Sequence, residues 1–206
     1  MKKLTALLLA LVMVMGLVAC GAKNETPTED ENNANVEQTP EEDVTPETPA
    51  IGSAVEVLET IWGLYGEDEK FFVWGGDMNN MVDGAPGAYG LEDAESLSVQ
   101  LLVPVEEVTN ITEAASLFHG MMLNNFSCGV FKVAEGVDAA AFAETMHNAV
   151  ANAQWMCGMP EKELIAVIGG EYVLMCFGIN DAVNPFEAKL MEAYPEANVV
   201  YSQAIG

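Results

Sequence analysis

The pattern of hydrophobic and polar positions divides the chain into three parts. Residues 4–18 are almost all apolar, and residues 21–49 are almost all polar. From Ile51 onward, apolar positions recur with the spacings of helices and strands. Because only this last part has enough apolar residues to build a core, we expect residues 51–206 to form a single globular domain.

Helical spacing is clearest over residues 138–156. One face of this predicted helix carries Phe142, Met146, Ala149, Val150 and Ala153. A second helix is predicted over residues 53–65, where Ser53 can cap the first turn. A third begins at Asn184-Pro185, because asparagine is a good cap and proline fits the first helical position. It ends at about Tyr194.

Short apolar runs bounded by glycine, proline or asparagine predict strands. These runs are residues 71–74, 98–103, 164–168, 171–177 and 198–202. Gly169-Gly170, between two of them, can supply the positive φ angles of a two-residue hairpin turn. Residues 75–93 are predicted to be a long loop, and Pro104 starts a short helical turn over residues 105–108.

Residues 112–133 allow two interpretations. Asn124-Asn125 separates the apolar runs 117–123 and 126–133, which predicts a hairpin with a type I′ turn. Alternatively, residues 112–123 form a helix that Asn110 and Glu113 cap. We favour the hairpin. The elements together predict an α+β fold, in which an antiparallel sheet with hairpins is packed by about three helices.

The N-terminal apolar run has the organisation of a secretory signal. Met1-Lys2-Lys3 is a short positive start, and the run ends in Leu17-Val18-Ala19-Cys20. This ending resembles the bacterial lipobox, in which Leu17, Val18 and Ala19 form the recognition signal. The resemblance implies that residues 1–19 are a lipoprotein signal peptide and that Cys20 carries a diacylglycerol. We therefore expect a lipid-anchored protein on the extracytoplasmic face of the cell membrane.

Residues 20–50 are predicted to be a disordered acidic tether. They contain nine acidic residues and four prolines but few large apolar side chains, so they cannot offset the entropy cost of folding. Like charges and proline keep such a segment extended. The expected role is a spacer between the membrane and the domain.

The charge of the whole chain narrows the choice of partners. There are 32 acidic residues against 7 basic ones, for a formal net charge of −25. Binding to nucleic acid requires clustered lysine and arginine, and the chain has no arginine. We therefore expect no nucleic-acid partner. The expected partners are the membrane, through the Cys20 anchor, and an unidentified envelope protein or small ligand.

Part of the domain resembles a known lipoprotein family. The segments that carry the resemblance are GVFKVA at 129–134, MPE at 159–161, GEYVL at 170–174 and Asn180-Asp181. Over roughly residues 103–190, the chain is similar to an uncharacterised family of bacterial lipoproteins. This family is a domain of unknown function (number 4358) found mostly in Gram-positive anaerobes. The resemblance implies a tethered envelope protein, and it assigns neither chemistry nor functional residues.

The domain contains no recognised catalytic motif. Neither His119 nor His147 lies in a zinc-binding motif, and there is no G-x-S-x-G elbow or phosphate-binding glycine loop. We expect His147 to lie at the edge of the apolar face of its helix. We expect no cofactor. Cys128, Cys157 and Cys176 are odd in number, so at most one disulfide can form among them. Their apolar neighbours favour buried thiols at Cys128 and Cys176, and whether a disulfide forms stays open.

Two further sets of residues are candidate sites. In one loop, side chains that carry oxygen atoms occur at alternate positions, as in a calcium-binding loop, but the loop lacks the closing glutamate of such a site. The residues of this set are Asp77, Asn79 and Asp83. Trp155 is a large aromatic residue on the polar face of its predicted helix, and Trp74 and Tyr89 flank the glycine-rich loop. A tryptophan in this position either marks a contact surface for a partner or folds under the loop that follows it, and Trp74 and Tyr89 are candidates to line a ligand cleft.

The function expected from these features is that of a non-enzymatic accessory or binding module of the cell envelope. The alternative is a carboxylate-dependent envelope enzyme that acts on wall polymer or peptide. It would use two of the many acidic side chains as general acid and base. Such a pair must converge in one cleft.

The lipobox predicts that Cys20→Ser abolishes the lipid anchor. Serine has no thiol to alkylate, so the two acyl chains that hold the protein in the bilayer are not added. Fractionation of cells, with the mass of the chain measured in each fraction, checks this. A variant that remained in the membrane fraction at the processed mass of the wild type would contradict the lipobox.

Overall fold

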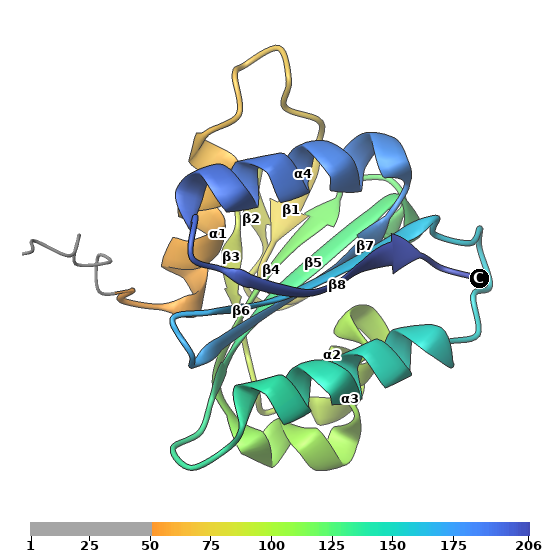
Figure 1. Cartoon of the computed structure of the whole chain (residues 1–206). Coiled ribbons are helices and arrows are strands. Elements are labelled where there is room, and N and C mark those ends of the chain that lie inside the picture. The colour runs from red at the N-terminus through yellow and green to blue at the C-terminus, as the bar shows by residue number, and fades with distance from the viewer. Residues whose placement is uncertain (1–50) are drawn as a thin grey trace, which may run out of the picture. The chain divides into compact units, whose positions relative to one another are not determined.

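The computed structural model describes residues 51–206 (Figure 1). The predicted signal peptide, the Cys20 anchor and the tether lie outside the described residues. Within the described part, none of the helices is both long and apolar enough to cross a bilayer. The domain has three layers, in which a sheet lies between two pairs of helices (Figure 1).

The sheet is antiparallel and contains eight strands within residues 51–206. They are β1 (Val73–Gly75), β2 (Val82–Asp83), β3 (Gly87–Tyr89), β4 (Ile111–His119), β5 (Phe126–Val133), β6 (Lys162–Ile168), β7 (Tyr172–Gly178) and β8 (Asn198–Ala204). The order is β2-β1-β4-β5-β7-β6-β8, and β3 also pairs with β4. Strands β5 and β7 therefore lie at the centre of the sheet.

Two α-helices cover each face of the sheet. The helices are α1 (Ala54–Gly63), α2 (Ala94–Leu101), α3 (Ala139–Ala151) and α4 (Asn180–Ala193), with 3₁₀ turns at Val105–Asn110 and Leu123–Asn125. Helices α1 and α4 pack on one face, and α2 and α3 pack on the other. The side chains of Ser53, Asp93 and Asp138 cap α1, α2 and α3 by accepting hydrogen bonds from first-turn N–H groups.

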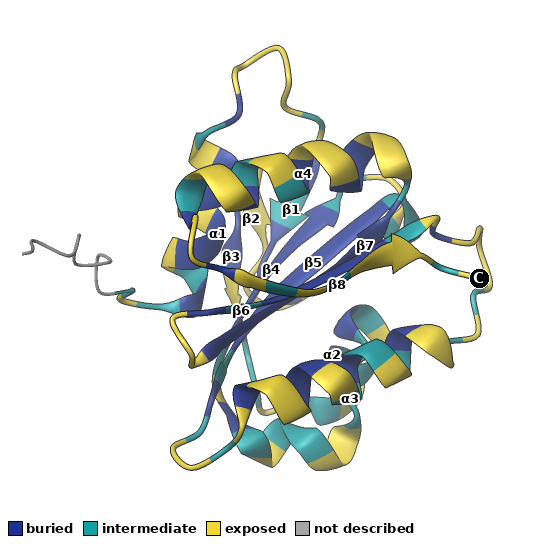
Figure 2. Cartoon of the chain, in the orientation of Figure 1, coloured by how far each residue is buried: buried dark blue, intermediate teal, exposed yellow. Residues whose placement is uncertain are grey.

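A hydrophobic core lies on each side of the sheet (Figure 2). Side chains alternate along β5, because successive residues of a strand point to opposite faces. Phe126, Cys128 and Val130 pack toward α1 and α4, whereas Phe131 and Val133 pack toward α2 and α3. Strand β7 is buried along its whole length. Strand β7 therefore has no solvent face, and its sequence is a continuous apolar run, whereas β5 is interrupted by Ser127 and by the partly exposed Lys132.

The predicted α+β fold is confirmed, and so is the hairpin over residues 117–133. Strands β4 and β5 pair antiparallel, as do β6 and β7. Gly169 and Gly170 form the predicted turn between β6 and β7, with φ angles of 59° and 76°. The type I′ turn at Asn124-Asn125 is wrong. Residues 120–125 join β4 to β5, and they end in a 3₁₀ turn.

The region before β4 differs most from the prediction. Residues 98–101, predicted to begin a strand, form the second half of α2, whose Leu97 and Leu101 are fully buried. A helix of this length shows only two turns of periodicity, so the following Leu102 and Val103 made the segment resemble an apolar strand. The predicted loop at 75–93 contains the short strands β2 and β3. Helix α3 ends at Ala151, earlier than predicted.

Helix α4 begins at Asn180, five residues before Pro185, which was the predicted first helical position. The Glu161 side chain accepts a hydrogen bond from the Asn180 backbone N–H at 2.8 Å. Pro185 therefore lies inside the helix rather than at its first position. Because the carboxylate that stabilises this helix start comes from a distant part of the chain, the local pattern at Asn184-Pro185 indicated the wrong start.

Close packing at the end of β7 predicts that Gly178→Ala destabilises the domain. A Cβ atom at this position would overlap the carbonyl oxygen of Asn125, a backbone atom that cannot move freely. We expect a loss of about 1–3 kcal/mol in the free energy of unfolding, measured by urea denaturation. Gly63→Ala is the control, because a Cβ there meets no atom within 4 Å. A loss no larger than that of the control would contradict the packing at Gly178.

Candidate functional site: a methionine-lined groove

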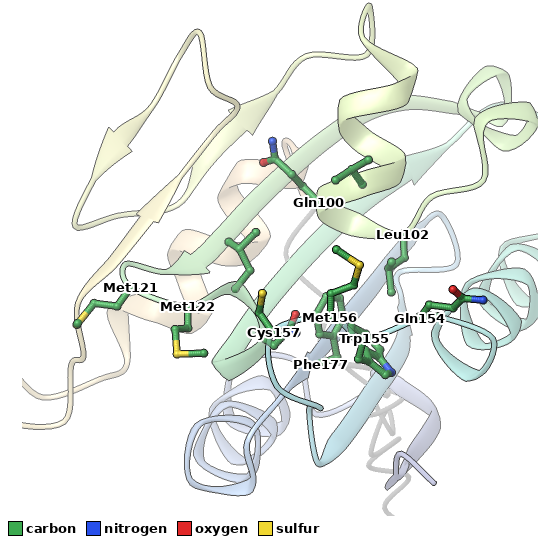
Figure 3. Close-up of a pocket in the computed structure, with 13 residues that line it drawn as sticks. Gln100, Leu102, Met121, Met122, Gln154, Trp155, Met156, Cys157 and Phe177 are labelled. Carbon is green, nitrogen blue, oxygen red and sulfur yellow. The ribbon is translucent and has the colours of Figure 1, made fainter.

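A cavity of about 550 Å³ opens on the α2/α3 side of the sheet (Figure 3). Its walls are Val99, Gln100 and Leu102 at the end of α2, residues 121–124 between β4 and β5, residues 153–157 after α3, and Phe177 of β7. These segments are distant in sequence, and the fold brings them together at one end of this face. The cavity is thus lined mainly by the segments that connect helices and strands, and the rigid sheet supports these segments.

Local contacts hold these walls in place. Leu102 ends α2 with a φ of 56°, the one positive value of a non-glycine residue within 51–206. The Trp155 ring packs against Phe177, with ring centroids 5.0 Å apart. The side-chain amide of Asn124 donates a hydrogen bond to the carbonyl oxygen of Gly158 at 2.6 Å. This bond ties the β4–β5 connection to the segment after α3.

The lining is apolar and rich in methionine. Met121 and Met156 are 82% and 90% exposed, an unusual position for a residue type that is mostly buried. The lining residues, all within the described part, include no charged side chain, although the chain is strongly acidic. The side-chain oxygen of Gln100 is buried without a hydrogen-bond partner among the described residues. The cavity therefore suits an apolar, uncharged molecule.

A second cavity, of about 410 Å³, continues the first. Both are lined by Val99, Gln100, Met121 and Leu123, and we term the two together the methionine groove. His119 lines the second cavity and also positions the β4–β5 connection. Its Nδ1 atom accepts hydrogen bonds from the backbone N–H groups of Met121 and Met122, at 3.1 and 3.3 Å.

Two of the three aromatic residues predicted to form a contact surface line this groove. Trp155 lies in the first cavity and Trp74 in the second. Tyr89 does not, because its side chain is buried and its hydroxyl group shares a hydrogen bond with the Ser96 hydroxyl at 2.9 Å. Sequence reasoning missed Met121 and Met122, since both lay in a run predicted to be a strand. Two methionines directly after Gly120 were the only available signal.

The carboxylate of Asp77, part of the calcium candidate, is occupied by its own loop. Its Oδ1 atom accepts hydrogen bonds from the backbone N–H groups of Asn79 and Asn80 at 2.7 and 3.0 Å, and Oδ2 accepts one from Gly90 at 3.0 Å. Asp83 is exposed in β2. Between residues 51 and 206, no three His, Cys, Asp or Glu side chains are placed together so that they could hold a metal ion.

The hydrogen bonds to Asp77 predict a pH-dependent contribution to stability. Burial raises the pKa of this carboxyl group, but the N–H groups of Gly90, Asn79 and Asn80 outweigh burial and hold it below its ordinary value. A lowered pKa stabilises the fold above the unfolded-state pKa of about 3.9, and this stability is lost as the pH falls through the folded-state pKa.

We therefore expect Asp77→Asn to reduce the free energy of unfolding by about 2 kcal/mol near neutral pH. The deficit should shrink in acid, where the wild-type carboxylate becomes protonated as well. Urea denaturation across this pH range measures the difference. Asp83→Asn, at an exposed position of the same region, is the control. A deficit that was constant with pH would contradict the role of the charge.

A buried carboxylate lies elsewhere on the α3 side. Glu163 of β6 is 2% exposed, and its Oε1 atom accepts a hydrogen bond from Gln203 at 2.8 Å and lies 2.9 Å from His147 Nδ1. The His147 ring stacks on Tyr201, with 3.9 Å between centroids. His147 thus joins α3 to β6 and β8, and none of these four residues lines the methionine groove.

Comparison of the chain with protein-family models, with curated proteins and with solved structures finds no match. The resemblance to the uncharacterised lipoprotein family therefore stays a prediction. The function has to be argued from the groove and from the sequence before it.

Proposed function

We propose that this protein is a membrane-anchored binding module of the cell envelope, and that it binds an apolar, uncharged ligand in the methionine groove. The observation that carries the proposal is the cavity of about 550 Å³ with no charged residue in its lining. Ligand-binding pockets usually measure about 300–1,000 Å³ and are lined mainly by apolar side chains with a few polar groups. The groove has this size and this chemistry.

The exposed side chains at the groove support a role in binding. Exposing a cluster of large apolar residues leaves hydrophobic free energy unused, at about 25 cal/mol for each Å² that a ligand would cover. Contiguous apolar patches on a soluble domain therefore mark interaction sites. Methionine suits such a site, because its flexible thioether chain adapts to ligands of different shape.

The N-terminal sequence supports the proposed location. The signal-like run ends in Leu17-Val18-Ala19-Cys20, and an acidic, proline-rich segment separates it from the domain. An anchor of this kind places the groove outside the cytoplasm and within reach of the membrane surface.

The alternative, an enzyme with paired carboxylates, has less support. Asp77, Glu92 and Asp93 line one small pocket of about 50 Å³, which is large enough for water but not for a segment of polymer. Asp77 already accepts several N–H hydrogen bonds, and Asp93 caps α2. Two of the three carboxylates are therefore engaged in holding the fold. The larger cavity, by contrast, offers no acid or base for this chemistry.

Binding of a neutral fluorescent probe, N-phenyl-1-naphthylamine, tests the proposal. We expect Met122→Glu to weaken binding at least tenfold, because the new carboxylate would have to lose its hydration beside the probe. A tenfold change corresponds to about 1.4 kcal/mol. Affinity should change little with salt, since the groove contributes no charge.

Met191→Glu is the matched control for this experiment. Met122 and Met191 are similarly exposed, at 44% and 37%, but Met191 lies on α4, on the opposite side of the sheet. Its variant should bind the probe like the wild type. Equal weakening in both variants, or an unchanged affinity in both, would contradict the groove as the binding site.

A further inference from the structure

Cys128 and Cys176 lie directly opposite each other on the two central strands. They are paired residues in the antiparallel register of β5 and β7. Both are fully buried, and both side chains belong to the core beneath α1 and α4. The structure shows both as free thiols.

Backbone hydrogen bonds at the two ends of the β5–β7 pairing show whether Cys128 and Cys176 form a hydrogen-bonded or a non-hydrogen-bonded pair. Val133 N–H donates to the Glu171 carbonyl group, and Ile179 N–H donates to the Asn125 carbonyl group, each at 2.9 Å. Hydrogen-bonded and non-hydrogen-bonded pairs alternate along an antiparallel ladder. Residues 125 and 133 are therefore in hydrogen-bonded pairs, and Cys128, an odd number of positions from each, is in a non-hydrogen-bonded pair.

This pair type has the spacing of a disulfide. Cα atoms of non-hydrogen-bonded pairs lie about 4.5 Å apart, with side chains closer together than in the other pair type. Disulfides span Cα distances of about 4.4–6.8 Å. Both side chains also lie in the same core, where burial raises the pKa of the Cys176 thiol well above its ordinary value and the neighbouring Cys128 raises it further. The spacing typical of this pair type therefore falls within the range that a disulfide spans.

The third cysteine of the domain cannot compete for either partner. Cys157 is exposed and lines the methionine groove, on the α2/α3 side of the sheet. The sheet separates it from the core that contains Cys128 and Cys176. Three cysteines allow three pairings, and the fold leaves one.

We propose that Cys128 and Cys176 form a cross-strand disulfide in the exported chain, while Cys157 stays a thiol. The oxidant is a disulfide-bearing molecule. One cysteine thiolate attacks it, which forms a mixed disulfide and releases one thiol. The second cysteine then attacks the mixed disulfide and releases the second thiol. The protein loses two protons and two electrons, and the oxidant disulfide is reduced to two thiols.

Because both sulfur atoms are buried, the bond has to form while the fold is incomplete or open. A reagent cannot reach either sulfur in the folded domain, so the bond forms before β5 and β7 close or during an opening of the fold. Once formed, it closes a loop over residues 129–175. That loop contains α3, β6 and the groove wall at 153–157. The bond thereby restricts the unfolded chain.

Alkylation of cysteines in cells tests the proposal. Cells are lysed in denaturant with N-ethylmaleimide, and the digested chain is analysed by mass spectrometry. We expect the peptides of Cys128 and Cys176 to be joined and Cys157 to be alkylated. Alkylation of all three cysteines, or a linkage that includes Cys157, would overturn the proposal.

A refolding experiment tests whether the two cysteines can pair, independently of whether the protein is exported. The full chain with Cys20→Ser, which removes the lipidation thiol, is reduced and refolded with oxidised glutathione. With Cys157→Ser added, it should lose both remaining thiols, and reduction should then lower its melting temperature by at least about 5 °C. With Cys176→Ala added instead, reduction should leave the melting temperature unchanged. A Cys157→Ser chain that kept both thiols would refute the pairing even if the protein is exported.

Discussion

Strands β5 and β7 present apolar side chains to both sides of the sheet, so the domain must cover two faces with helices. One face is covered by α1 and α4, and the core there is continuous from α1 to the end of α4. The other face is covered by α2 and α3, which have 8 and 13 residues. Burial on both sides fixes the register of the strands, because a slip of one residue would exchange the two faces.

The methionine groove follows from how the second face is completed. Helix α2 ends at Leu101 and α3 at Ala151, and beyond them the cover consists of irregular segments. Trp155 packs on Phe177, and Asn124 bonds to Gly158, so these segments are held without filling the space between them. An apolar surface is left accessible on a rigid support, which is the usual arrangement of a binding site.

The sequence predicted those parts of the fold whose signals are local. The α+β class, both hairpins and three of the four helices described could be expected from periodicity, caps and the Gly169-Gly170 turn. The start of α4 depends on Glu161, and α2 is too short to show its period, so tertiary contacts decided both. Of the groove, Trp155 and Trp74 could be suspected as aromatic residues at unusual positions. Met121 and Met122 could not, because exposure of an apolar residue depends on what the rest of the chain leaves uncovered.

The central claim is that the groove is where an apolar ligand binds, and methyl NMR tests it most directly. With isotope-labelled methionine methyl groups, the probe N-phenyl-1-naphthylamine should shift the signals of Met121, Met122 and Met156, which line the groove. The signals of Met146, buried in the core, and of Met191, on α4, should stay in place. Saturable shifts at Met191 without shifts at the three groove methionines would contradict the account.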